Sequence, residues 1–216
     1  MVLTLTAFTS PRKTRIVFFG DSITEFGIAK GGYIDKIEAA LGKGNKAGAY
    51  ELTGAGVGGN KIYDLLFRID EDVIARKPDV VVVYEGVNDV WHKKAGTGTD
   101  LDKYEKFYTS VLKKLESKKI RLILVTPACI GEKKNNANAM DEDLNKYCDV
   151  IRKLAANFHC TLVDFRKLAQ SYETKNNTEN KDQGLLTTDG VHLTDTGNQL
   201  LADALLKVLL KSETTK

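Results

Sequence analysis

The 216-residue sequence predicts an α/β fold, built as a three-layer α/β/α sandwich around a parallel sheet. Short runs that are apolar throughout, with no alternation of apolar and polar residues, indicate strands that are covered on both faces. Segments with apolar side chains at helical spacing separate these runs. Strands that alternate with helices in this way favour βαβ units, and therefore a parallel sheet with helices on both sides.

Four runs rich in β-branched and aromatic residues have the character of strands, and a weaker candidate brings the sheet to five strands. In chain order the predicted strands are Arg15–Gly20, the weaker Tyr50–Thr53, Asp79–Glu85, Ile120–Thr126 and Cys160–Asp164. Every apolar run is far shorter than the ~20 residues that a membrane span requires. We therefore expect no membrane-spanning segment.

Amphipathic stripes between these runs predict helices over residues 33–41, 61–69, 104–115, 144–155 and 200–210. Two polar stretches, Ile130–Met140 and Gln170–Gly184, do not fit the alternation and are predicted to be loops. Loops of this length in compact domains often carry substrate contacts. The pattern indicates one domain over residues 15–212, preceded by an N-terminal extension over residues 1–14.

Composition excludes several classes of protein. There are 32 Lys and Arg against 29 Asp and Glu, so the formal net charge is only +3. A nucleic-acid-binding surface needs clustered excess positive charge, and we expect no nucleic-acid partner. A hydrophobic fraction of 42% with a small net charge also excludes a disordered chain.

The cysteines and the first residues of the chain provide evidence about the cellular compartment of the protein. Cys129, Cys148 and Cys160 are odd in number and scattered, which predicts buried free thiols or at most one bridge, and no zinc site. Residues 1–10 lack the basic start and long apolar stretch of a signal peptide. We expect a soluble protein that is either cytoplasmic or exported with a leader removed. Its oligomeric state is left open.

The residues that follow the predicted strands are unusually informative, because α/β sheets bind ligands beyond the carboxyl ends of their strands. Gly20-Asp21-Ser22-Ile23-Thr24 follows the first strand. Gly54-Ala55-Gly56-Val57-Gly58-Gly59-Asn60 follows the second, and Gly86-Val87-Asn88-Asp89 follows the third. Asp189-Gly190-Val191-His192 stands just before the last helix.

These four blocks closely resemble those of the SGNH, or GDSL, hydrolase family, and they occur in the family's order. The resemblance implies a flavodoxin-like fold and hydrolysis of carboxylic esters, with small acyl groups on sugars, lipids or thioesters among the substrates. It implies Ser22 as nucleophile, with Asp189 and His192 as its partners. The oxyanion hole would be formed by Ser22, Gly59 and Asn88. One departure is Gly54, which stands where the family's second block commonly begins with asparagine.

The chemistry of these side chains agrees with the resemblance. A serine hydroxyl becomes a good nucleophile when a neutral imidazole takes its proton, and a carboxylate on the other ring nitrogen fixes the tautomer. Asp189 and His192 are three residues apart, so a single turn can present both. None of the blocks holds clustered metal ligands, and we expect neither a metal nor a cofactor. Structural roles are the competing interpretations: a helix cap for Ser22, a tight turn for Gly59 and a loop hydrogen bond for Asn88.

Two further residues border the predicted site as substrate-binding candidates, Asp21 and Trp91. Asp21 is better interpreted as holding the turn that exposes Ser22, because a carboxylate facing the oxyanion would oppose catalysis. Trp91 follows the third block and is better interpreted as a core or rim residue, although its place at the carboxyl end of a strand also allows a platform for substrate.

Other functions compete with a small-ester hydrolase. Residues 54–59 match the GxGxxG pattern of dinucleotide-binding domains, but the strand before them is weak and the acidic residue expected ~20 positions later is missing. A non-catalytic carbohydrate-binding domain on the same fold is a second alternative. A lysophospholipase or thioesterase is a third. The polar loops favour a short acyl ester, such as an acetyl ester, of a carbohydrate or another small polar alcohol.

Overall fold

The computed structural model describes residues 12–43 and 48–211, and it confirms the predicted α/β architecture. Its five strands form one parallel sheet in the order β2-β1-β3-β4-β5, which is the flavodoxin-like order. The strands are β1 (Thr14–Gly20), β2 (Tyr50–Gly56), β3 (Val80–Tyr84), β4 (Arg121–Val125) and β5 (Thr161–Val163). The order reverses between β1 and β3, which is the topological switch point where such folds bind ligands.

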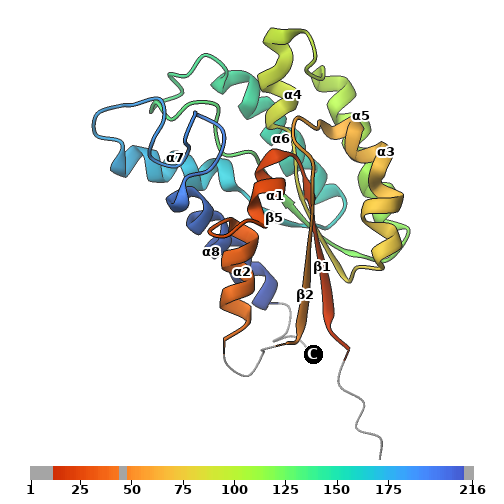
Figure 1. Cartoon of the computed structure of the whole chain (residues 1–216). Coiled ribbons are helices and arrows are strands. Elements are labelled where there is room, and N and C mark those ends of the chain that lie inside the picture. The colour runs from red at the N-terminus through yellow and green to blue at the C-terminus, as the bar shows by residue number, and fades with distance from the viewer. Residues whose placement is uncertain (1–11, 44–47, 212–216) are drawn as a thin grey trace, which may run out of the picture.

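Helices cover both faces of the sheet (Figure 1). One face packs against α2 (Tyr33–Leu41), α7 (Phe165–Asn176) and α8 (Asp195–Lys211). The other packs against α3 (Ile62–Asp72), α5 (Leu101–Glu116) and α6 (Asp141–Asn157). Successive strand side chains enter opposite layers: Ile16 and Phe18 join the first core, and Val17 and Phe19 join the second. This is why the strands are apolar throughout.

Short helices begin at the carboxyl ends of two central strands. Helix α1 (Ser22–Gly27) follows β1, and α4 (Val87–Trp91) follows β3. The 3₁₀ helices η2 (Ile74–Arg76) and η3 (His92–Ala95) lie elsewhere in the connections. A Cβ on Gly20 would lie 2.1 Å from the Tyr84 carbonyl oxygen, and one on Gly56 would lie 2.0 Å from the Glu25 nitrogen. Glycine at position 20 therefore accommodates the neighbouring end of β3, and glycine at position 56 lets α1 approach the end of β2 closely.

One predicted loop is partly wrong. Residues 130–140 are irregular as expected, but α7 continues through residue 176 into the stretch predicted as a loop over 170–184. The buried face of α7 is short and includes the polar Arg166 and Glu173 beside Phe165 and Ala169. A helix that buries polar side chains lacks the apolar stripe by which it would have been predicted.

The predictions for the ends of the chain and for the cysteines can also be compared with the structure. Residues 1–11 lie outside the described residues, and β1 already begins at Thr14 within the predicted extension 1–14. The three cysteines are free, as expected, with Cys129 and Cys148 buried and Cys160 partly buried. Among the described helices, none combines the length and the hydropathy that crossing a bilayer needs.

Candidate active site

Ser22 occupies the first position of α1, directly after β1. The carboxylate of Asp21 caps this helix by accepting a 2.9 Å hydrogen bond from the Ile23 backbone nitrogen. Asp21 itself is buried, with 1% of its surface exposed, whereas the turn leaves Ser22 7% exposed. The structure therefore supports the interpretation of Asp21 as a turn-holding residue, and its burial argues against the substrate-binding role that was also considered.

The structure brings together Ser22 and the turn before α8, although they are 170 residues apart. The Ser22 Oγ lies 2.9 Å from His192 Nε2, and His192 Nδ1 lies 2.7 Å from Asp189 Oδ2. The other oxygen of Asp189 accepts from the backbone nitrogens of Val191 and His192 at 3.0 and 2.8 Å. Gly190 allows this tight turn with a φ of +92°.

These contacts indicate which ring nitrogen of His192 carries the proton. Burial opposes ionisation of Asp189, but hydrogen bonds from the His192 side chain and from two backbone nitrogens lower its pKa below the usual value. An ionised carboxylate only accepts, so Nδ1 of His192 must carry the proton that it donates. In the neutral ring Nε2 is then free to accept the Ser22 hydroxyl proton. The arrangement can activate Ser22 as a nucleophile.

Candidate oxyanion donors come from the second and third motif blocks. The Asn88 side chain is buried, and its Nδ2 donates to the Asn60 carbonyl at 3.0 Å. A primary amide has two N–H groups, so one remains for a ligand. A Cβ on Gly58 would lie 4.0 Å from Ser22 Cβ, which places the second block beside the nucleophile. The next residue, Gly59, has a φ of +75° and open space where a side chain would lie.

Arg68 is a supporting residue that the sequence analysis missed. From α3, its guanidinium donates to the Gly20 and Ala55 carbonyls at 2.7 and 2.9 Å and to Asn60 Oδ1 at 2.7 Å. It thereby joins the ends of β1 and β2 to the residue whose carbonyl holds Asn88. Arginine within an amphipathic helix resembles an ordinary surface residue, so no sequence signal distinguished it.

Glu132 was also missed, and it supports the turn that carries the histidine. Its side chain is fully buried in the 130–140 loop. One oxygen accepts from the Leu185 nitrogen at 2.8 Å, and the other from the Leu186 nitrogen at 2.9 Å and from the nitrogen and hydroxyl of Thr187. Three consecutive backbone nitrogens just before Asp189 are thus held by one carboxylate.

We expect Glu132→Ala to lower the free energy of unfolding by about 3 kcal/mol or more, because several buried donors lose their acceptor at once. Activity per folded molecule should also fall, since the turn with Asp189 and His192 loses its support. Urea unfolding and esterase assays on one preparation measure both effects. Glu179→Ala is the matched control, because that carboxylate is exposed and its one ion pair within the described part of the chain is with Lys181. A Glu132→Ala protein as stable as the control would contradict the expected role.

Aromatic rings flank the histidine. The Trp91 ring centroid lies 6.1 Å from that of His192, so this residue lies beside the candidate base. Phe26, which the sequence analysis did not single out, lies 5.6 Å from His192 and is 57% exposed. It stands four residues after Ser22 on the same helix, a spacing that puts both on one face and could have revealed it.

Three acidic side chains of the first and third motif regions, Asp21, Glu85 and Asp89, are buried. Burial raises the pKa of Asp21 to about 7 and that of Asp89 to about 6, and it raises the pKa of Glu85 well above its usual value. Asp89 accepts from the Ile62 nitrogen, which ties the third block to α3. Glu85 accepts from the Gly86 nitrogen at 3.0 Å. These acids bond backbone nitrogens in the turns around the site. Their ionisation costs free energy of folding because they are buried.

This burial predicts that stability falls with rising pH. A carboxylic acid whose pKa is higher in the folded state binds more protons there, so its contribution is full below the ordinary pKa near 4 and is lost as pH rises through about 7. Each such group lowers the free energy of unfolding by up to about 1.4 kcal/mol per pH unit within that window. Asp21→Asn retains the helix cap and should flatten the slope. Urea unfolding between pH 5 and 8 measures the slope of the free energy of unfolding against pH. An equal slope in wild type and in Asp21→Asn would contradict a raised pKa of Asp21.

No metal centre accompanies this arrangement in the residues that the structure describes, where no group of three or more His, Cys, Asp or Glu side chains could hold an ion. Residues 54–56 of the GxGxxG match belong to the strand β2 itself. A dinucleotide fingerprint begins in the turn after a strand, so this placement argues against the dinucleotide-binding alternative.

A flavodoxin-like sheet with a hydrogen-bonded serine, histidine and aspartate at its switch point defines a serine hydrolase of the SGNH type. Comparison with family models agrees: residues 18–200 match the model of the GDSL-like Lipase/Acylhydrolase family. The chain belongs to this family, and it is a carboxylic ester hydrolase.

The comparisons also found similar proteins that are named acetylxylan esterases. A solved structure of the acetyl xylan esterase AlAXEase is 51% identical, with a TM-score of 0.89, and the match covers 91% of this chain and 100% of that one. The acetylxylan esterase of Geobacillus stearothermophilus is 28% identical over 89% of this chain and 92% of its own length. A structure of a catalytic mutant of that enzyme, Axe2, with histidine replaced by alanine is 26% identical, with a TM-score of 0.79, over 91% of this chain and 94% of its own.

Proposed function

We propose that this protein removes acetyl groups from acetylated xylose-based carbohydrates through a Ser22–His192–Asp189 triad. The observation that carries the proposal is the hydrogen-bonded chain from Ser22 Oγ through His192 to Asp189. The similarity to acetylxylan esterases supports the choice of substrate. The exposed ring of Phe26 beside His192 suits a sugar, because an aromatic face packs well against the apolar face of a pyranose.

The proposed reaction has two steps, acylation and deacylation of Ser22. Ser22 Oγ attacks the acetyl carbonyl carbon while His192 Nε2 takes its proton, and the Asp189 carboxylate stabilises the imidazolium. His192 returns this proton to the sugar oxygen as the ester bond breaks, which leaves an acetyl group on Ser22. Water then attacks the acetyl-enzyme with His192 again as the base. Acetate leaves, and the proton returns to Ser22.

The negative charge that develops on the carbonyl oxygen requires donors that are already in place. In the proposal these are the backbone nitrogens of Ser22 and Gly59 and the second N–H of Asn88. The Ser22 nitrogen lies in the first turn of α1, where backbone N–H groups have no acceptor within the helix. The chain Arg68–Asn60–Asn88 fixes the orientation of the Asn88 amide, so that little reorganisation is needed during the reaction.

We expect Asn88→Ala to lower kcat by about 100-fold or more with little change in KM, because the lost bond forms mainly in the transition state. If Asn88 only braced its loop, the variant would instead melt early and retain its activity per folded molecule. Measuring kcat, KM and melting temperature on one preparation separates the two outcomes, and early melting with normal turnover would remove Asn88 from the oxyanion hole.

The proposed substrate is tested with a panel of esters. We expect release of acetate from acetylated xylooligosaccharides, and nitrophenyl ester hydrolysis that declines as the acyl chain lengthens from acetate to octanoate. A preference for octanoate would favour the lysophospholipase or thioesterase alternative. Hydrolysis of nitrophenyl acetate without release of acetate from the oligosaccharides would retain the esterase and overturn the carbohydrate substrate.

A further inference from the structure

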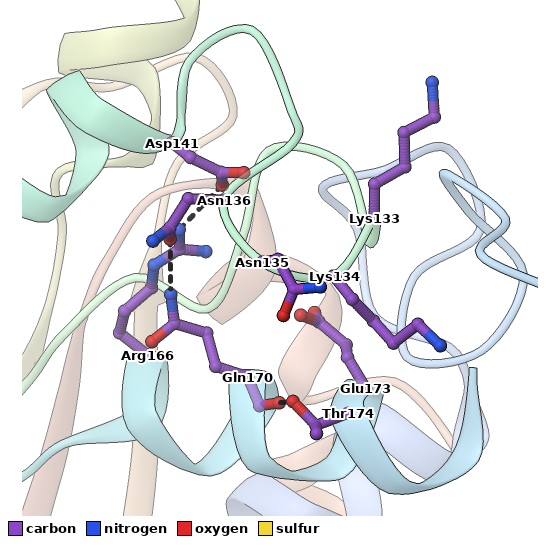
Figure 2. Close-up of a pocket in the computed structure, with 9 residues that line it drawn as sticks. All are labelled: Lys133, Lys134, Asn135, Asn136, Asp141, Arg166, Gln170, Glu173 and Thr174. Carbon is purple, nitrogen blue, oxygen red and sulfur yellow. Dashed lines mark hydrogen bonds and ion pairs between the residues drawn. The ribbon is translucent and has the colours of Figure 1, made fainter. Parts of the chain in front are cut away.

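A polar cavity lies at the same edge of the sheet as the candidate active site. It has a volume of about 210 Å³ and is lined mainly by the loop over residues 133–136 and by α7 (Figure 2). Pockets that bury a drug-sized ligand are usually ~300–1,000 Å³, so this one suits a single small unit. Gly131, at the base of the loop, donates to the Gly190 carbonyl at 2.8 Å. The wall of the cavity is thereby joined to the turn that carries Asp189 and His192.

Glu173 is the residue that marks the cavity as a binding site. Its side chain lies on α7, is 3% exposed, and has one carboxyl oxygen without a hydrogen-bond partner among the described residues. Figure 2 shows this carboxyl group directed away from the helix toward Asn135, on the loop side of the cavity. Burial raises its pKa to about 7. Of the buried side-chain atoms without a partner in the described residues, Glu173 Oε1 is the one that lines this cavity, where a ligand or solvent can complete its bonding.

The charges around the cavity argue against an anion or a metal ion as the ligand. The guanidinium of Arg166 is compensated, because it bonds Asp141 at 2.7 Å as well as Asn145 and the Ala128 carbonyl. Figure 2 shows the ammonium groups of Lys133 and Lys134 directed away from Glu173. An anion would therefore meet the Glu173 carboxyl group without a free cation beside it. Among the described residues, no set of ligands for a metal ion includes Glu173.

The remaining groups both donate and accept hydrogen bonds. Gln170 and Asn136 are bonded to each other at 3.1 Å, and Asn135 and Thr174 complete the lining. Amides, a hydroxyl and a carboxyl group are matched by a ligand that carries several neutral hydroxyl groups, since each hydroxyl donates once and accepts as well. This is the hydrogen-bonding character of a sugar ring.

We propose that this cavity binds one unacetylated sugar unit of the carbohydrate whose acetyl ester lies at Ser22. The inference rests on the proposed function and adds to it a second contact with the substrate. In this arrangement Glu173 bonds a sugar hydroxyl, and Gln170 and Asn136 form the adjoining wall. The site would favour oligosaccharides over short acetylated sugars, because only the former reach both places.

The test is titration of the full chain with xylotriose, which carries no ester and is not hydrolysed by an esterase. Amide chemical shifts of residues 133–136 and 170–174 report binding in the cavity. We expect Glu173→Leu to raise the Kd for xylotriose at least 10-fold, because the apolar side chain removes the hydrogen bond without burying a charge. Glu173→Gln should remain within about threefold of wild type, because an amide of the same shape still bonds a hydroxyl.

Two further variants complete the design. Gln170→Ala should weaken binding in the same way if Glu173→Leu fails to fold. Lys175→Ala, an exposed position on α7 outside the cavity, is the control that should bind as wild type does. Wild-type protein that hydrolyses nitrophenyl acetate through Ser22 but shows no shift of the cavity amides would overturn the sugar site alone. Binding that Glu173→Leu and Gln170→Ala both leave intact would also overturn it, whereas failure to hydrolyse nitrophenyl acetate would overturn the proposed function.

Discussion

Replacing Ser22 with alanine is expected to lower kcat for nitrophenyl acetate by about 10⁶-fold, while the fold and melting temperature change little. The size of this decrease in kcat is that of comparable triads. Loss of the nucleophile there removes the covalent route and leaves only the contributions of the oxyanion hole and of substrate binding. The hydroxyl bonds only His192 among the described contacts, so its loss leaves the packing of α1 intact.

Fluorophosphonate labelling gives a direct measurement of this prediction. Wild-type protein should be modified once, at Ser22, and Ser22→Ala should not react. Ser110→Ala is a matched control, because that hydroxyl bonds a backbone carbonyl on the exposed face of α5. Labelling of a serine other than Ser22 in active protein would refute the assignment of the nucleophile.

Loss of the base is expected to have the second largest effect. His192→Ala should lower kcat by about 10⁵- to 10⁶-fold, because Ser22 then has no group to take its proton. Asp189→Asn should cost less, about 10⁴-fold, because the imidazole remains but its tautomer is no longer fixed by an acceptor at Nδ1. Steady-state kinetics across the three proteins measure this ranking.

His159→Asn is the control for the histidine. His159 is exposed, lies just before β5 and therefore at the opposite end of the sheet from Ser22, and has a φ of +52° that asparagine tolerates. Its replacement should leave kcat within twofold of wild type. An Asp189→Asn variant less active than His192→Ala, or a His192→Ala variant with near-normal turnover, would contradict the proposed triad.

Much of the fold could be predicted because its signals are local. Each strand is a contiguous run that is buried on both faces, so β1 and β3 were located to within one residue from their apolar character. The edge strand β2 is more exposed and extends three residues beyond its predicted end. Helix α7 was not predicted, because Arg166 and Glu173 are buried through polar contacts, which no hydrophobic periodicity reveals.

What the sequence by itself determined is therefore the sheet, the positions of Ser22 and Asn88 after β1 and β3, and, through the motif resemblance, the candidates Asp189 and His192. Parallel strands bring their carboxyl ends to one edge, so residues that directly follow strands must gather there. Only the tertiary structure decided which distant side chains support them. Arg68 reaches Gly20 across 48 residues, and Glu132 reaches Leu186 across 54. Such partners are selected by the packing of whole elements, and a single charged residue in a helix or loop carries no mark of the contact it will make.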